Sequence, residues 1–340
     1  MSEIMERKLA TVQMIKYIKY VDADNIECAE ILGWSCVVKK GDFKTGDLCV
    51  YCEYDSVLPV REEFEFLRKS CFDPKVNGFR IRTVIMRGQV SQGIAFPISI
   101  LKRNNVSIGD DVTQELGIKL YEPEIPDCEK NQIAGKFNNI VPNTKEVRIQ
   151  SIPNVLDNYY DEFFVITEKV DGFSSTFYSD DEGKVHVGKR NWEFKDGINN
   201  VYTHMVKKYG LEEILGKTHY NIAIQGEIIG PGIRKNKYKL NDFQLWIFNI
   251  FDIEEWKYWS FKKIWSFCDY FNLLSVPIIG VFNHLDYDSI IGITEGNSFI
   301  NRSVKREGIV VRSINEINDN IYGRLSFKSI SSKFLIDNKE

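Results

Sequence analysis

The sequence predicts an α+β protein with two domains, a small antiparallel β-barrel or sandwich followed by a larger domain of antiparallel sheets with flanking helices. The first 120 residues consist of short alternating segments rich in Val, Ile, Tyr and Phe, separated by Gly-Asp turns such as "KKGDFKTGD". Residues 121–146 interrupt this pattern with three prolines and many polar residues, as linkers do. Beyond them, strand patterns alternate with longer runs at helical spacing, which indicates the α+β class.

The composition limits the possible functions. The chain has 340 residues, of which 43% are hydrophobic, enough for one large or two medium domains. Its net charge of −4 excludes a globally basic surface, so a polyanion would have to meet a local basic patch. Seven cysteines are scattered, and we expect reduced core thiols. The single C-x-x-C pair, Cys49 and Cys52, lies in a strand pattern that points the two side chains to opposite faces, which argues against zinc.

The start of the chain does not resemble a secretory signal peptide. "MSEIMERKLATVQ" is charged from its beginning, and no run of the sequence approaches 18 uninterrupted apolar residues. We therefore expect an intracellular protein, cytoplasmic or nuclear, without a membrane span.

The second half supplies the helices and strands of the larger domain. Apolar residues recur at helical spacing in residues 196–216 and again in the aromatic stripe of residues 258–274, which is expected to be core. A hairpin is predicted around the "SDDEG" turn, and further strands are expected in "HYNIAIQGEIIG", "FQLWIFNIFDI", "REGIVVRS" and "YGRLSFKSI".

Four charged residues stand in or beside apolar strand patterns. They are Lys169 in "EKVDGFS", Glu227 in "QGEIIG", Glu307 in "EGIVVR" and Lys328 in "SFKSI". A charge in this position costs desolvation free energy unless it is paired or functional. Each one alone suits an ordinary strand-end charge, but the ordered set indicates a site.

This ordered set resembles the motifs of the covalent nucleotidyltransferases, the superfamily of polynucleotide ligases and RNA capping enzymes. The likeness covers residues 144–334 and is carried by "KEVRIQ" (145–150), "EKVDGFS" (168–174), "GKRN" (188–191), "QGEIIG" (225–230), "LWIFN" (245–249), "EGIVVR" (307–312) and "SFKSI" (326–330). The sequence is most similar to ATP-dependent RNA ligases of the Deinococcus/Naegleria type, which carry an OB domain first. The resemblance implies an OB-like, RNA-engaging domain in residues 1–125, a linker in 126–143, and an ATP-grasp-like adenylyltransferase domain in 144–340.

The resemblance also implies an activity, its cofactors and its partner. An RNA ligase of this type adenylylates its own lysine, transfers AMP to an RNA 5′-phosphate and joins that end to a 3′-OH. It requires ATP and Mg²⁺ or Mn²⁺, and it seals nicks in duplexes that have RNA on the 3′-OH side. We expect a monomer that works without a membrane.

The motif positions assign roles to particular residues. Lys169 is the implied nucleophile, and its ammonium is expected to be destabilised by Lys328 and bound Mg²⁺. The implied metal ligands, direct or through water, are Asp171, Glu227 and Glu307. The residues expected at ATP are Glu168, Arg148, Ser174, Arg190, Phe248, Glu227 and Lys328. Taken alone, Phe248 also suits a core aromatic, and Ser174 suits a turn hydroxyl.

Two basic stretches are the candidate RNA contacts. "GIRKNKYK" (232–239) contributes Arg234, Lys235 and Lys237. "RIRTVIMR" is expected to place Arg80 and Arg82 on one face of a strand, with Arg87 beyond them. A solvated surface is the alternative for both stretches.

One departure from the family pattern leaves a question about the last motif. Related RNA ligases often have two lysines there, whereas Ile330 follows Lys328 at that spacing, and Lys333 is the candidate substitute. The alternative functions are a GTP-dependent capping guanylyltransferase, a DNA ligase and a catalytically silent RNA-binding protein. The first two carry an OB domain after the last motif, where only 10 residues follow Ile330 here.

Overall fold

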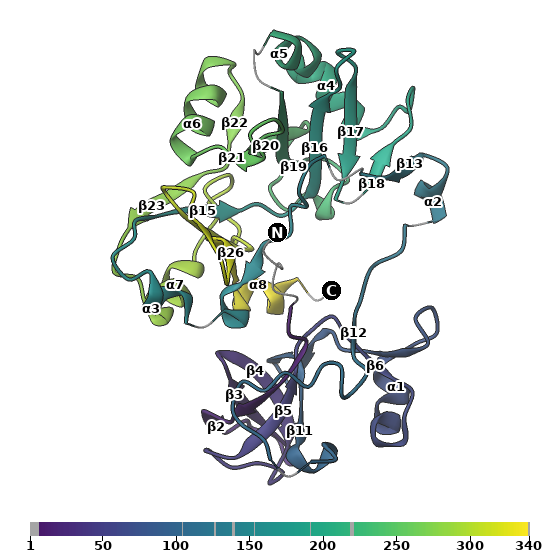
Figure 1. Cartoon of the computed structure of the whole chain (residues 1–340), viewed down its shortest axis with the longest axis vertical. Helices are drawn as coiled ribbons and strands as arrows, with labels where there is room; N and C mark the ends of the chain where they lie inside the picture. Colours follow the sequence, from purple (N-terminus) through teal and green to yellow (C-terminus); the bar gives the residue numbers. More distant parts are fainter. Residues whose placement is uncertain are drawn as a thin grey trace. The chain divides into compact units, whose positions relative to one another are not determined.

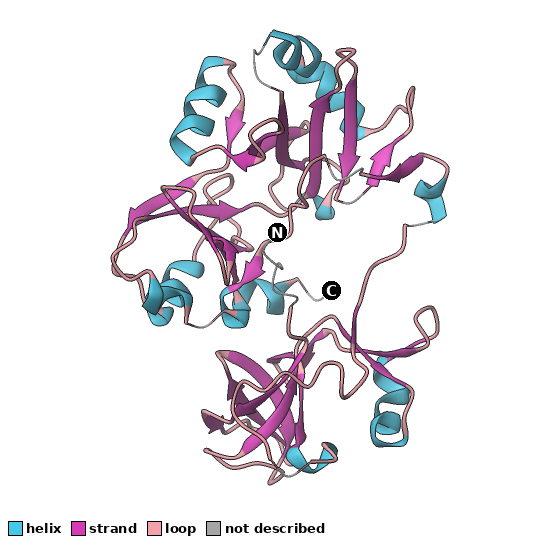
Figure 2. Ribbon diagram, in the orientation of Figure 1, coloured by secondary structure: helices cyan, strands magenta, loops and turns pink. Residues whose placement is uncertain are grey.

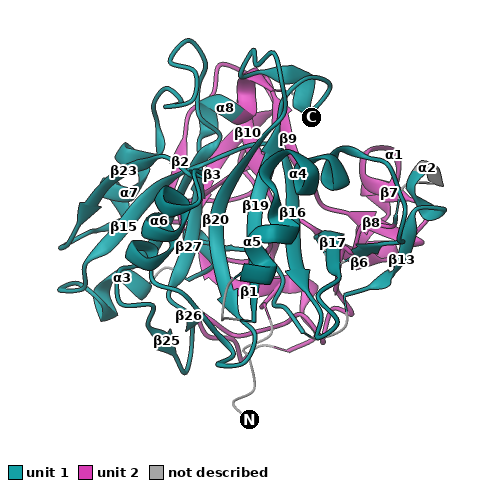
Figure 3. Ribbon diagram, turned by 90° about the horizontal axis from the view of Figure 1, so that it is seen from above, with its two compact units in different colours: residues 1–4, 125–334 teal, residues 5–124, 335–340 magenta. Residues whose placement is uncertain are grey.

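The computed structural model describes residues 7–103, 105–125, 127–137, 140–152, 154–190, 192–217 and 221–338. The chain forms two compact units. The N-terminal unit comprises residues 5–124 and 335–340, and the C-terminal unit comprises residues 1–4 and 125–334 (Figure 3). Strands dominate both units, and short helices accompany them (Figures 1 and 2).

Within its described residues, the N-terminal unit has small antiparallel sheets with the strand orders β1-β5-β11, β2-β3-β4, β10-β9 and β12-β6-β8-β7. The strands are β1 (Ala10–Met14), β2 (Tyr17–Lys19), β3 (Ile26–Ile31), β4 (Trp34–Lys39), β5 (Leu48–Cys52), β6 (Ser56–Pro59), β7 (Phe72–Asp73), β8 (Gly78–Arg80), β9 (Thr83–Met86), β10 (Gln89–Gln92), β11 (Ile94–Pro97) and β12 (Lys119–Leu120). The helical turns are η1 (Glu62–Leu67), α1 (Arg68–Cys71) and η2 (Ile98–Ile100).

Strand β5 shows how alternation builds this unit. Its residues Val50 and Cys52 belong to one buried apolar cluster, whereas Cys49 and Tyr51 belong to another. The predicted opposite orientation of the two cysteines is therefore confirmed, as period-two geometry requires. Burial raises the pKa of the Cys49 thiol to about 12, so this thiol stays protonated at neutral pH.

The described part of the C-terminal unit contains two main sheets. One has the order β13-β18-β17-β16-β19-β20-β21 with β22 beside β20, and the other has the order β14-β27-β24-β15-β23. We call them the large sheet and the small sheet. The strands are β13 (Ile133–Lys136), β14 (Val147–Arg148), β15 (Phe164–Lys169), β16 (Phe173–Ser179), β17 (Val185–Lys189), β18 (Trp192–Phe194), β19 (Ile222–Ile229), β20 (Gln244–Asp252), β21 (Lys257–Tyr258), β22 (Leu274–Ser275), β23 (Ile278–Phe282), β24 (Gly308–Ser313), β25 (Asn318–Asp319), β26 (Gly323–Arg324) and β27 (Ser326–Ile330).

Helices and helical turns lie between these strands along the chain. They are α2 (Asp127–Lys130), η3 (Ile149–Ser151), α3 (Val155–Asn158), α4 (Val201–Tyr209), α5 (Leu211–Lys217), η4 (Arg234–Asn236), α6 (Phe261–Tyr270), α7 (Tyr287–Thr294) and α8 (Ser332–Asp337). The run predicted as helical in 196–216 is divided at Gly210, whose φ of 60° ends α4. Asn200 and Thr203 form a capping box at the start of α4. None of the described helices has the length and apolar character that a membrane crossing requires.

The predicted linker contains part of the large sheet. β13 pairs antiparallel with β18, with Ile133 opposite Phe194. The ring of Phe137 lies so close to Gly188 that a Cβ there would meet it at 1.5 Å. The linker prediction is therefore wrong for residues 133–137, because Ile133 and Phe137 are apolar side chains that pack on the sheet.

The "K-V-D-G" segment joins the two sheets. β15 ends at Lys169 in the small sheet, and β16 begins at Phe173 in the large sheet. A Cβ at Gly172 would lie 2.2 Å from the carbonyl oxygen of Ile228, so only glycine permits this approach of two backbones. Lys169 thus precedes the crossing, and the predicted hairpin of β16 and β17 follows it.

Candidate active site

Lys169 and Glu307 form an ion pair at the ends of neighbouring strands. Lys169 Nζ lies 2.7 Å from Glu307 Oε2. The register places Lys169 opposite Gly308, the first residue of β24, so that Glu307 stands directly before this strand. A Cβ at Gly308 would come within 2.1 Å of the carbonyl oxygen of Ser329. The glycine after Glu307 therefore allows β24 and β27 to lie close together.

The carboxylates around Lys169 keep its side chain charged. Burial disfavours the ammonium, but the negative charges of Glu307, Glu227 and Asp171 outweigh burial and raise the pKa of Lys169. We expected neighbouring cations to destabilise this ammonium. The difference arises because Glu307 is in direct contact with it.

Lys328 and Arg148 lie on the same face of the small sheet as Lys169. Thr167 is opposite Val310, Val310 is opposite Lys328, and Lys328 is opposite Arg148. Cross-strand partners face the same side of a sheet, and so do side chains two residues apart on one strand, such as Thr167 and Lys169. The three cations therefore share one face.

The environment of Lys328 disfavours its charged form. Burial, followed by the charges of Lys169 and Arg148, lowers the pKa of Lys328 to about 7. Ile330, at the spacing of the absent second lysine, is buried. Lys333 is exposed on α8.

Glu227 approaches from the large sheet. It lies opposite Ser174 in the pairing of β19 with β16, and its Oε1 accepts a hydrogen bond of 3.0 Å from Gly172 N–H. Burial raises the pKa of Glu227 to about 7, helped by the negative charges of Glu307 and Asp171. The Ser174 hydroxyl is 2.9 Å from that of Thr144.

Asp171 is held by the loop that follows β19. Its carboxylate lies 3.1 Å from Lys237 Nζ and 3.4 Å from Arg234 Nε. Its backbone N–H donates to the Tyr238 hydroxyl at 2.9 Å. Two residues that we predicted as RNA contacts, Arg234 and Lys237, thus stand beside the predicted nucleophile segment.

The surroundings of Glu168 and Phe248 differ from those of Asp171, Glu227 and Glu307. Glu168 neighbours Lys169 and therefore faces the other side of β15, where it is 1% exposed. Its Oε2 accepts a hydrogen bond of 2.7 Å from Phe299 N–H, and burial raises its pKa. Phe248 is half-buried in an apolar cluster that includes Val170 and Tyr238. The register of β20 shifts at this point, so that Asn249 pairs with Gln225 and Ile247 with Gly226, and Phe248 occupies the shift.

Arg312 is a site residue that the sequence analysis did not single out. It is 2% exposed, its Nη1 donates to the Phe248 carbonyl at 2.9 Å, and its Nε donates to the Ser326 hydroxyl at 3.2 Å. Its hydrogen bond to Phe248 therefore connects β24 of the small sheet to β20 of the large sheet. Strand alternation was the available signal, since Arg312 stands two residues after Val310 in "EGIVVR".

The remaining predicted contacts are Arg190, Lys235, Arg80, Arg82 and Arg87. Arg190 and Lys235 are exposed, and Arg87 occupies the turn between β9 and β10 with a φ of 49°. The expected single strand carrying Arg80 and Arg82 is wrong, because β8 ends at Arg80 and β9 begins at Thr83. Arg80 pairs with Asp55 at 3.2 Å, and Arg82 pairs with Asp73 at 3.3 Å.

The residues present fit a divalent cation that is bound largely through substrate and water. Among the described residues, no group of three or more His, Cys, Asp or Glu side chains is arranged as an all-protein metal site. Mg²⁺ typically keeps several waters and uses one or two carboxylates together with substrate phosphates. Glu227 suits this role, since its half-buried carboxyl lies near the negative charges of Glu307 and Asp171. Asp171, Glu227 and Glu307 therefore remain predicted ligands of a divalent cation.

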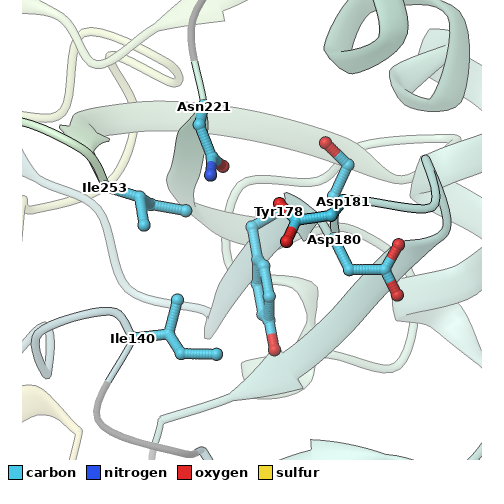
Figure 4. A pocket seen from close by; sticks show the side chains of 7 residues that line it. Ile140, Tyr178, Asp180, Asp181, Asn221 and Ile253 are labelled. Carbon is cyan, nitrogen blue, oxygen red and sulfur yellow. The ribbon is translucent and has the colours of Figure 1, made fainter.

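A separate cavity of about 240 Å³ lies away from these residues. It is lined by Ile140, Tyr178, Ser179, Asp180, Asp181, Asn221 and Ile253 (Figure 4). Tyr178 and Ser179 end β16, whereas Ser174 stands near its beginning. This cavity contains none of the predicted site residues.

A lysine paired with a carboxylate, a second lysine on the same sheet face and two sheets joined at "K-V-D-G" define a covalent nucleotidyltransferase. An OB-fold domain model matches residues 9–98, and an RNA ligase model matches residues 162–330. The chain belongs to the RNA ligase family, which confirms the predicted RNA ligase and decides against the capping enzyme and the DNA ligase. The fold is accordingly α+β, with an OB-fold domain before the ligase domain.

Solved structures of one relative carry this assignment. The chain is 35% identical to Naegleria gruberi RNA ligase with PPi, covering 98% of this chain and 99% of that one, with a TM-score of 0.80. It is 34% identical to a mutant of the same ligase with ATP and Mn, covering 98% and 100%, with a TM-score of 0.81. It is 34% identical to a mutant with AMP and Mn, covering 98% of this chain and 99% of that one, with a TM-score of 0.82. No curated protein sequence matches this chain.

Proposed function

We propose that this RNA ligase uses ATP and forms a lysyl-adenylate on Lys169. The observation that carries the proposal is the convergence of Lys169, Glu307 and Lys328 on one end of the small sheet, with Glu227 approaching from the large sheet. The similar Naegleria ligase has been solved with ATP and Mn, with AMP and Mn, and with PPi, which supports ATP as the nucleotide.

The first step needs an uncharged amine. The Lys169 nitrogen attacks the α-phosphorus of ATP, an N–P bond forms, the P–O bond to the β-phosphate breaks, and pyrophosphate leaves. Glu307 Oε2 accepts a hydrogen bond from Lys169 Nζ at an N–O distance of 2.7 Å and is therefore placed to receive the proton. Lys328 and Arg148, on the same sheet face, suit the oxygens of the α-phosphate.

Two further transfers complete sealing. An RNA 5′-phosphate oxygen attacks the lysine-bound adenylate and releases Lys169. A 3′-OH then attacks the adenylylated 5′-phosphate, a phosphodiester forms, and AMP leaves. We infer that the physiological substrate is a nicked duplex with RNA on the 3′-OH side.

The remaining residues are assigned to binding. Phe248 would stack on the adenine, and Glu168 would lie beside the adenine ring. Ser174 and Arg190 would meet ribose or phosphate oxygens. A divalent cation held by Glu227 with Asp171 and Glu307 would neutralise charge on the α-phosphate. Because it would also offset these carboxylates, it would favour loss of the Lys169 proton.

We assign RNA engagement to residues 1–125 and adenylyl transfer to residues 144–340, and we infer a monomer that acts inside the cell. Arg80, Arg82, Arg87 and Lys235 remain the candidate RNA contacts, together with Arg234 and Lys237 from the loop after β19. The pairing of Arg80 and Arg82 with aspartates leaves Arg82 the more accessible of the two, since its side chain is 56% exposed against 23% for Arg80.

The deciding experiment measures acid-stable transfer of label from α-labelled ATP to the protein, with α-labelled GTP in parallel, in Mg²⁺ and in Mn²⁺. We expect labelling by ATP and sealing of nicked RNA by the same preparation. Labelling by GTP alone, or sealing without a labelled protein, would contradict the proposal.

A further inference from the structure

Lys237 is enclosed in the site, whereas its basic neighbours lie at the surface. Its side chain is 11% exposed, and its Nζ lies 3.1 Å from Asp171 Oδ2. The ring centroids of Phe334 and Tyr238 lie 4.0 Å and 4.9 Å from the same nitrogen. By contrast, the Arg234 side chain is 39% exposed, and Lys235 and Lys239 are exposed. A lysine on a solvated RNA-binding surface would not be packed in this way.

The position of Lys237 is fixed by the shape of its loop. Arg234, Lys235 and Asn236 have φ values of 45°, 54° and 48°, so the backbone turns back on itself before Lys237. The Tyr238 hydroxyl then accepts the Asp171 N–H. The loop after β19 is thereby fastened to the segment that follows Lys169, with Lys237 directed at Asp171.

The charge of the site calls for a further cation. Asp171, Glu227 and Glu307 bring three carboxylates, and the nucleotide would add a multiply charged triphosphate. The second lysine of the last motif is absent, and Ile330 at that spacing is a buried apolar side chain. Lys333, the substitute suggested by the sequence, is exposed on α8.

We propose that Lys237 is a phosphate-binding residue of the ATP site, where it contacts the β- or γ-phosphate and supplies the positive charge that the last motif lacks. This inference rests on the proposed function. Lys237, in place of Lys333, then substitutes for the absent second lysine of the last motif. Its role is in the adenylylation step and not in RNA binding. Asp171 holds the ammonium in position, and phosphate oxygens of the nucleotide are its partners during lysine adenylylation.

The test compares Lys237→Met, which keeps the aliphatic stem against the two rings, with Lys237→Arg, which keeps the charge. Lys239→Met is the matched control two residues away. Because a charge-assisted contact is lost, Lys237→Met should reduce single-turnover self-adenylylation at low ATP roughly 10- to 100-fold, with Lys237→Arg between it and the parent. Lys239→Met should stay within about twofold of the parent, as expected for an exposed charge.

Binding measurements identify the ligand. In a Lys169→Met background, which cannot form the adenylate, Lys237→Met should weaken binding of ATP and of inorganic pyrophosphate while leaving AMP binding unchanged. Sealing of a pre-adenylylated nick should be unaffected. Normal ATP affinity and adenylylation in Lys237→Met would overturn the inference, and a defect confined to the pre-adenylylated nick would return Lys237 to RNA binding. Failure of the parent protein to label with ATP would refute the proposed function instead.

Discussion

The ammonium of Lys169 and the carboxylate of Glu307 are joined at 2.7 Å across the ends of β15 and β24. This pair contains the proposed nucleophile together with the group that holds its proton. Lys169→Ala should therefore abolish both self-labelling and sealing of unmodified ends, while sealing of a pre-adenylylated nick persists at a reduced level. Lys184→Ala, in the exposed turn between β16 and β17, is the control and should label normally. Covalent AMP on the Lys169 variant would show that another residue is the nucleophile.

Glu227 and Glu307 should both be needed for adenylylation. We expect Glu227→Gln and Glu307→Gln to slow the single-turnover step by about two orders of magnitude or more, because phosphoryl transfer depends on neutralisation of charge by an organised cation. The dependence of the rate on Mg²⁺ concentration is the measurement, and the exposed Glu182→Gln serves as the control. Parental rates at limiting Mg²⁺ in both variants would make these carboxylates structural.

Lys328 should be essential for activity and unfavourable for stability. Its pKa lies at about 7, below the ordinary lysine value of 10.5, because of burial and neighbouring cations. Between these two values the unfolded chain binds the proton that the folded protein lacks, so stability rises with pH across this window and is lowest below about 7. Lys328→Met should therefore raise the free energy of unfolding at pH 6 by more than at pH 9, while adenylylation is lost.

Urea unfolding at the two pH values and ATP labelling test this prediction, with Lys333→Met as the control for both. The exposed Lys333 variant should keep substantial self-labelling. If Lys333→Met is inactive and Lys328→Met is active, the assignment of the last motif is incorrect.

Gly172 and Gly308 should tolerate no side chain. A Cβ at Gly172 or at Gly308 would meet a backbone carbonyl oxygen at 2.2 Å or 2.1 Å. Gly172→Ala and Gly308→Ala should each cost roughly 1–3 kcal/mol of stability, as overpacking does, and should displace Lys169 or Glu307. Gly135→Ala, where nothing lies within 4 Å, is the matched control in urea unfolding and ATP labelling.

The domain assignment predicts separable activities. A fragment beginning at Ile125 should form the lysyl-adenylate but seal nicked RNA poorly, because it lacks the OB-fold domain. In the full chain, Arg82→Glu should weaken sealing, and the difference from the parent should diminish as salt rises, because salt screens phosphate contacts. Arg80 pairs with Asp55 and lies 3.4 Å from the ring centroid of Tyr121, so Arg80→Glu should destabilise the N-terminal unit in addition. Equal sealing by the fragment and the intact chain would assign another role to the first domain.

Local sequence patterns predict candidate site residues, but they do not predict which distant segments contact one another. Ordered motifs predict a site at Lys169, Glu227, Glu307 and Lys328 because each combines a charge with an apolar strand pattern, and strand alternation predicts which way each side chain faces. Pairing between distant segments is not written in such local patterns. The ion pair of Lys237 with Asp171 depends on a loop with left-handed residues, and the contact of Arg312 with Phe248 depends on a register shift in β20.

The N-terminal arginines show the same limit. Alternation in "RIRTVIMR" suggests one strand with a basic face, yet Ile81 is buried and the strand is broken after Arg80. The carboxylates that pair with these arginines, Asp55 and Asp73, come from other strands or turns of the same unit. Composition alone therefore overstated how much of this positive charge is available to RNA.

The short strand β13 has a consequence for solubility. Without it, β18 would be the edge of the large sheet, and its unpaired N–H and C=O groups would be a template for pairing with another chain. β13 covers that edge and is itself unsuited to such pairing, since it has four residues, a register shift between Ile133 and Gly135, and Lys136 at its end. A fragment cut at Asn143 would lose this protection and should self-associate, whereas one that begins at Ile125 should stay monomeric.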